Sequence, residues 1–189
     1  MTKNSKRAAM LAGCAMLLAM STGNGWAQEE MPVERAQAEA PAEAELGSWR
    51  FEEIVSPLEG TRTLAAVLTS STEVANIGGV PEPVELFIRC QNGSLSVFMG
   101  WPLYLGLNRG RLSYRFDSGE LRTETWQTST TGTAIGRFDD RQGRALIEQI
   151  GRSRQLAVRV LPQYFDPRET VFDLTGSAEV TARILDACS

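Results

Sequence analysis

The sequence contains no histidine, and its only lysines are Lys3 and Lys6. Without histidine, the usual serine and cysteine nucleophile systems cannot form, and neither can a histidine-ligated zinc site. A lysine-based mechanism has no residue beyond Lys6 to carry it. The common chemistry of several large enzyme classes is therefore excluded.

The chain also has no phosphate-binding loop and no long apolar run. Gly78-Gly79 and the glycines at 106 and 110 do not stand between a strand and a helix, as a nucleotide fingerprint requires. The longest apolar run, residues 8–20, has 13 residues, whereas a membrane-spanning helix needs about 20. We therefore expect no cofactor and no stable membrane insertion.

What the N-terminus does contain is the pattern of a signal peptide. Lys3, Lys6 and Arg7 precede the apolar run, and Gly25-Trp26-Ala27 places small residues at the −3 and −1 positions of a cleavage after Ala27. We expect export to the periplasm and residues 1–27 to be removed. Cys14 follows a lipobox-like Leu-Ala-Gly, but the apolar run continues past it, so we expect no lipid anchor there.

Residues 28–47 are rich in glutamate, alanine and proline, and they offer few side chains to bury, so we interpret them as an acidic linker. The rest, residues 48–189, is enough for a single domain. The formal net charge is −4, and residues 1–27 hold three positive and no negative charges, so the mature chain carries about −7. Such a charge disfavours nucleic acid and anionic lipid head groups as partners.

Two cysteines, Cys90 and Cys188, remain after cleavage at Ala27. An even number of cysteines in an exported chain favours a disulfide. This one would join the end of a predicted strand to the end of a predicted C-terminal helix. Two unpaired buried thiols are the alternative.

Alternation of apolar and polar residues predicts two β-hairpins. In the first, residues 84–90 and 94–101 flank Asn92-Gly93, a pair that tolerates the positive φ of a tight hairpin turn. In the second, residues 111–117 and 121–129 flank a Ser-Gly-Glu turn. Each hairpin exposes one face of its strands and buries the other.

The remaining chain predicts further strands at 155–161 and 169–174, and a strand or short helix within 62–70. Residues 72–83 contain Gly-Gly and two prolines, which predicts a loop.

Two helices complete the prediction. One covers 143–153, with Ala145, Leu146, Ile147 and Ile150 as candidate buried residues, and the other covers 177–187, capped by Ser177. The fold class we predict is mainly β with α additions: an antiparallel β-sandwich or open barrel with a C-terminal helix, closed by the disulfide.

Few side chains in the sequence are suited to a catalytic or binding site. Asp139-Asp140 can bind a cation or act as acid and base, but aspartates are also ordinary turn residues. A sheet face displaying Arg89, Arg115 and Trp126 can bind a carboxylate or phosphate ligand through guanidinium forks. The alternative is a solvated face whose arginines pair with acids on neighbouring strands.

Several spaced motifs resemble the VasI/TagO family of type VI secretion-associated envelope proteins. They are Trp49 with Ser56-Pro57-Leu58, LFIRCQNG at 86–93, LSYRFD at 112–117, Trp126 with Ser129, the strand 156–161 before Pro162, and FDLTG at 172–176 before a helix that ends at Cys188. Together they cover residues 49–188.

The resemblance implies a non-catalytic periplasmic accessory protein that docks to envelope or secretion-apparatus proteins, or to the cell wall. It matches Cys90 and Cys188 to a disulfide pair, and Arg89, Arg115 and Asp117 to recurring polar positions. The alternatives are a small-ligand- or glycan-binding β-domain of the envelope unrelated to secretion, and a histidine-free hydrolase with two acids in one cleft.

Overall fold

The computed structural model describes residues 46–189. The predicted signal peptide, the cleavage after Ala27, Cys14 and nearly all of the predicted linker lie outside the described residues. The described residues form nine strands and two helices: β1 (Trp49–Val55), β2 (Arg62–Ala75), β3 (Pro81–Gln91), β4 (Ser94–Gly100), β5 (Arg109–Phe116), β6 (Arg122–Thr128), β7 (Ala134–Arg137), α1 (Asp140–Ile150), β8 (Gln155–Leu161), β9 (Arg168–Asp173) and α2 (Ser177–Ala187).

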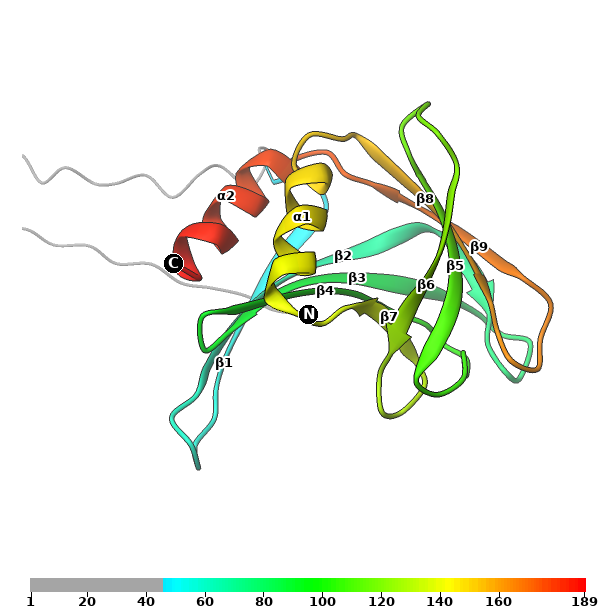
Figure 1. Cartoon of the computed structure of the whole chain (residues 1–189), viewed down its shortest axis with the longest axis horizontal. Coiled ribbons are helices and arrows are strands. Elements are labelled where there is room, and N and C mark those ends of the chain that lie inside the picture. Colours follow the sequence, from blue (N-terminus) through cyan, green and yellow to red (C-terminus); the bar gives the residue numbers. More distant parts are fainter. Residues whose placement is uncertain (1–45) are drawn as a thin grey trace, which may run out of the picture. The chain divides into compact units, whose positions relative to one another are not determined.

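All nine strands belong to one sheet with the order β1-β2-β3-β4-β7-β6-β5-β8-β9, and every neighbouring pair is antiparallel. The sheet curls until β9 approaches β2, which gives an open barrel with α1 and α2 grouped at one end (Figure 1). The predicted fold class, mainly antiparallel β with a C-terminal helix, is confirmed.

The curled sheet is joined between β2 and β9 by side chains. The Thr170 hydroxyl donates to the Thr72 carbonyl at 2.7 Å, and the Val171 N–H donates to the Thr72 hydroxyl at 3.2 Å. The pairing of β2 with β3 shifts register between Thr69 and Glu73, just where this contact forms. The irregular segment of β2 thus turns polar groups toward β9.

Both predicted hairpins are present. In β3–β4 the turn residues Asn92 and Gly93 have φ of 52° and 72°, as a two-residue hairpin of this kind requires. In β5–β6 the residues Leu112, Tyr114 and Phe116 are buried on one face, as their alternation predicts.

The N-terminal part of the sheet differs from the prediction. The segment within 62–70 is a strand, not a helix, and it pairs with β1, a strand the sequence did not predict. The predicted loop at 72–83 is wrong at both ends, because β2 continues to Ala75 and β3 begins at Pro81. The two prolines are tolerated since Pro81 is the first residue of its strand and Pro83 lies beside the register shift.

Both helices also differ in detail. α1 begins at Asp140, three residues before the predicted start, because the Asp139 carboxylate accepts the Gln142 N–H and caps the helix. Ala145 is exposed, so it was wrongly predicted as buried. In α2 the N-cap is Gly176, at φ 84°, and the Ser177 hydroxyl instead donates to the Ile150 carbonyl at 2.9 Å, which ties α2 to the end of α1.

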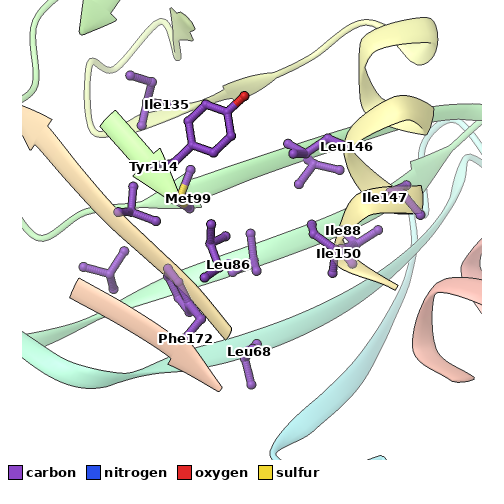
Figure 2. Packing of buried hydrophobic residues seen from close by; sticks show 14 of the residues in the cluster. Leu68, Leu86, Ile88, Met99, Tyr114, Ile135, Leu146, Ile147, Ile150 and Phe172 are labelled. Carbon is purple, nitrogen blue, oxygen red and sulfur yellow. The ribbon is translucent and has the colours of Figure 1, made fainter. Parts of the chain in front are cut away.

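The core fills the curl of the sheet. Leu86 and Met99 of the strands lie on the same side of α1 as Leu146 and Ile150, so that the helix packs apolar side chains into the sheet's interior (Figure 2). A void of about 10 Å³ remains among the side chains of this core, which is at the lower limit of the space that one water molecule needs. The interior is a packed core without room for a ligand.

Cys90, at the end of β3, and Cys188, directly after α2, form a disulfide with a Cα–Cα distance of 5.6 Å. Both cysteines are buried. The predicted bridge is therefore confirmed, and it fixes the C-terminal helix to the first hairpin. Within residues 46–189 neither helix has the length and apolarity to span a membrane.

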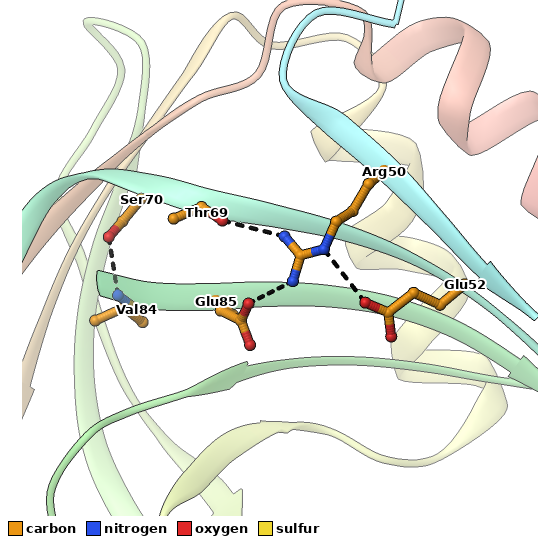
Figure 3. Close-up of polar contacts among 6 residues, drawn as sticks. All are labelled: Arg50, Glu52, Thr69, Ser70, Val84 and Glu85. Carbon is orange, nitrogen blue, oxygen red and sulfur yellow. Dashed lines mark hydrogen bonds and ion pairs between the residues drawn. The ribbon is translucent and has the colours of Figure 1, made fainter. Parts of the chain in front are cut away.

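Polar contacts order the outer face of β1, β2 and β3. The Arg50 guanidinium donates to Glu52, to the Thr69 hydroxyl at 3.1 Å and to Glu85 (Figure 3). Hydrogen bonds to Glu85 and Glu52 raise the pKa of Arg50, although its partial burial acts in the opposite direction. This arginine is paired across three strands, which is the solvated-face arrangement that the sequence left open.

Candidate functional site

Asp117 has a structural position. It lies in the turn after β5 with φ 48°, and its carboxylate accepts the N–H groups of Arg154 and Gln155, both at 2.9 Å. Its own N–H donates to the Gln155 carbonyl. Both N–H groups donate to Oδ1, so the side chain fastens the β5–β6 turn to the start of β8.

Arg89 belongs to a packed layer on the outer face of β3 and β4. Its guanidinium lies 5.2 Å from the centre of the Phe98 ring and donates to the Ser96 hydroxyl at 3.2 Å. Phe98 stacks on Phe87 and Phe138. Desolvation by these neighbours lowers the pKa of Arg89, which is consistent with a packing role.

Trp126 faces inward, and its exposed fraction is 3%. Its indole N–H donates to Glu124 Oε2 at 2.9 Å, and the Tyr114 hydroxyl donates to Glu124 Oε1 at 2.8 Å. Arg137 donates to the same carboxylate and lies 4.5 Å from the centre of the Trp126 ring. Glu124 is thus the centre of a cluster of three donors under α1.

A cavity of about 340 Å³ opens above this Glu124 cluster, between the sheet and α1. Burial alone would raise the pKa of Glu124, but hydrogen bonds from Trp126 and Tyr114 and the charges of Arg137 and Arg122 lower it. Burial and the hydrogen bond to Glu124 raise the pKa of the Tyr114 hydroxyl. At neutral pH the cluster therefore holds an ionised carboxylate among neutral and cationic donors.

Replacing Glu124 with glutamine should lower the free energy of unfolding by about 1 kcal/mol at pH 7, because charge-assisted hydrogen bonds at a partly exposed site become neutral ones. A carboxyl whose pKa is lowered by folding stabilises the protein above its ordinary pKa, and this stabilisation is lost as the pH falls. Urea unfolding between pH 7 and pH 3 should show the two proteins converging in acid. Glu148→Gln, on the exposed side of α1, is the control and should change little.

Arg115 lies on a different surface, the outer face of β5. This face carries alternate residues of the strand, namely Arg109, Arg111, Ser113 and Arg115. Within residues 46–189 none of these three arginines forms an ion pair. A shallow cavity of about 420 Å³ lies beside Arg115, over β5, β8 and β9. We call these four residues of β5 the arginine row.

The predicted binding face is therefore not assembled. Arg89 on β3 and Arg115 on β5 have β4, β7 and β6 between them, and Trp126 points into the core. Sequence reasoning missed Arg109 and Arg111, although the pattern Arg-Gly-Arg-Leu-Ser-Tyr-Arg already places them on the same face as Arg115.

A second exposed feature is formed by loops. Because neighbouring strands are antiparallel, the loops after β2, β4, β6 and β8 all lie at one end of the sheet, away from the two helices (Figure 1). Of nine large hydrophobic side chains that are exposed in residues 46–189, five lie at this loop end: Ile77, Val80, Leu107, Leu161 and Tyr164. Tyr164 stacks on Tyr104 from the loop after β4.

The arrangement needed by a two-acid hydrolase is not found in these cavities. The cavity under α1 has Glu124 as its one acid, and the cavity beside Arg115 has Glu169. Asp139 caps α1, and Asp140 accepts the Leu95 N–H and pairs with Arg144, so both have local structural partners. In the described part of the chain, no three His, Cys, Asp or Glu residues gather as metal ligands.

Comparisons with known proteins provide little information about this chain. No family model matches the chain, and no curated protein matches it. Among solved structures, the crystal structure of invasion associated protein B from Bartonella henselae is similar, with a TM-score of 0.47 and 12% sequence identity over 75% of this chain and 93% of that chain. A likeness at this level carries no conclusion about function.

Proposed function

We propose that the mature chain is a non-catalytic accessory domain of the bacterial envelope that docks to an envelope or secretion-apparatus protein through its loop end. The observation that carries the proposal is the gathering of Ile77, Val80, Leu107, Leu161 and Tyr164 at one end of the sheet. Single exposed apolar side chains are common on proteins, but several at one pole are typical of interaction surfaces. The disulfide and the signal-like N-terminus support a site of action outside the cytoplasm.

The resemblance to the VasI/TagO family supports type VI secretion as the process. Genes for a contractile sheath and baseplate beside this one would favour that assignment. Their absence, together with genes of another envelope system, would favour an envelope domain unrelated to secretion.

The docking proposal is tested by a pull-down with the mature protein from detergent extracts of the envelope. The variant Ile77→Ser/Leu107→Ser/Tyr164→Ser should lose an envelope protein that the wild type recovers, because it removes the apolar contact area. The control variant Ile54→Ser/Leu58→Ser changes equally exposed side chains at the β1–β2 tip and should recover it. Equal recovery by all three proteins, or recovery of no envelope protein, contradicts the proposal.

A further inference from the structure

We propose that the arginine row on β5 binds a phosphate-bearing polysaccharide of the envelope. The row begins beside the loop end, since Arg111 pairs with Leu161 across β5 and β8, but it consists of other side chains, and the inference does not depend on the proposed function. It begins from a local reversal of charge: the chain is acidic overall, with a net charge of −4, yet this face of β5 presents three arginines and no acid.

The geometry suits a linear ligand. Alternate residues of a strand stand about 7 Å apart, so the row from Arg109 to Arg115 extends over about 20 Å. The three guanidinium groups are exposed, and each can offer a planar fork to a phosphate. Successive anionic groups along an extended chain can thus contact successive arginines.

Neutral donors fill the space between the arginines. The Ser113 hydroxyl lies 2.8 Å from the Thr123 hydroxyl of β6, and Thr125 lies directly opposite Arg111. Hydroxyl groups of this kind bind both phosphate oxygens and sugar hydroxyls. A phosphate has more acceptor oxygens than a carboxylate, so it uses such a mixed set of donors more fully.

The cavity beside Arg115 extends the row sideways. Ser113 and Arg115 line it together with Ala157 and Arg159 of β8, and its one acid, Glu169, pairs with Arg159. Leu121 and Val171 also line it, so part of its surface is apolar. A hollow that combines such apolar surface with hydroxyl and guanidinium donors suits a sugar ring, which has apolar faces and hydroxyl groups around its edge.

Binding of the mature protein to a phosphomannan is the test, measured by calorimetry at low salt. The variant Arg111→Gln/Arg115→Gln should bind about tenfold more weakly, because two charge-assisted contacts are lost. Neither side chain has a hydrogen-bond partner within residues 46–189, so the variant should keep the wild-type unfolding transition. Arg141→Gln/Arg154→Gln removes the same charge near the helical end and should bind within about twofold of the wild type.

Further probes separate the possible sources of the anion. Unphosphorylated mannan should not bind, and higher salt should weaken the phosphomannan complex. Equal binding of phosphomannan by the wild type and both variants would overturn the proposal. So would binding to phosphatidylglycerol vesicles without binding to phosphomannan, or an equal affinity for inorganic polyphosphate of the same phosphate density, since the sugar would then contribute nothing.

Discussion

Replacing Cys90 and Cys188 together with alanine is expected to lower the free energy of unfolding by about 4–5 kcal/mol. The bridge joins residues 98 apart in sequence, and in the chain-entropy model a loop of about 100 residues confers about 4.7 kcal/mol by restricting the unfolded chain. Urea unfolding of the mature protein, followed by far-UV circular dichroism, measures the change. The double variant is preferred because it leaves no free thiol.

The wild type in excess reductant is the matched control, since it loses the same covalent link without a change of sequence. It should unfold at the same urea concentration as the double alanine variant. A loss of less than about 1 kcal/mol in both would mean that packing of α2 already holds the chain end, and that the bridge restricts the unfolded state far less than the chain-entropy model predicts.

Replacing Phe172 with alanine is expected to cost about 3–5 kcal/mol, the usual range for emptying a large buried aromatic site. Phe172 is fully buried, although β9 is the last strand of the sheet. Its ring lies beside Leu68 and Leu86 where the sheet curls back on itself (Figure 2). The variant therefore removes the side chain that fills the gap between the two ends of the sheet.

Leu161→Ala provides the comparison, because Leu161 is 51% exposed on the neighbouring strand β8. The free energy of unfolding of this variant should lie within about 0.5 kcal/mol of the wild-type value. Thermal and urea unfolding of both variants measure the difference. If the two variants were equally stable, the interior would have collapsed around the missing ring, and the tightly packed core described above would be contradicted.

The sequence allowed much of the sheet to be predicted where apolar and polar residues alternate strictly. β8 was placed at its observed bounds, and the Asn92-Gly93 turn identified the first hairpin. β1 was missed because Trp49–Val55 has only two buried or packed apolar residues, Trp49 and Phe51, at its start, while its end is exposed. Prolines and glycines misled the prediction near residue 80, since a strand start and a register shift both tolerate proline.

The candidate site was less predictable for a topological reason. Alternation shows which residues share a face of one strand, but it does not give the order of strands in the sheet. Arg89 and Arg115 are on outward faces, as their patterns indicate, yet three strands separate them. Trp126 was placed on the same face as these arginines, whereas its contacts with Glu124 and Tyr114 hold it inside.

The absence of space inside the curled sheet has a consequence for how such a domain changes over time. A barrel that binds its ligand in the interior must change core side chains to accept a new ligand, and each such change can destabilise the fold. Here the helix α1 occupies that volume, and the arginine row and the loop end lie on surfaces that contribute little to stability. New recognition properties can therefore arise by substitution at the periphery while the scaffold stays intact.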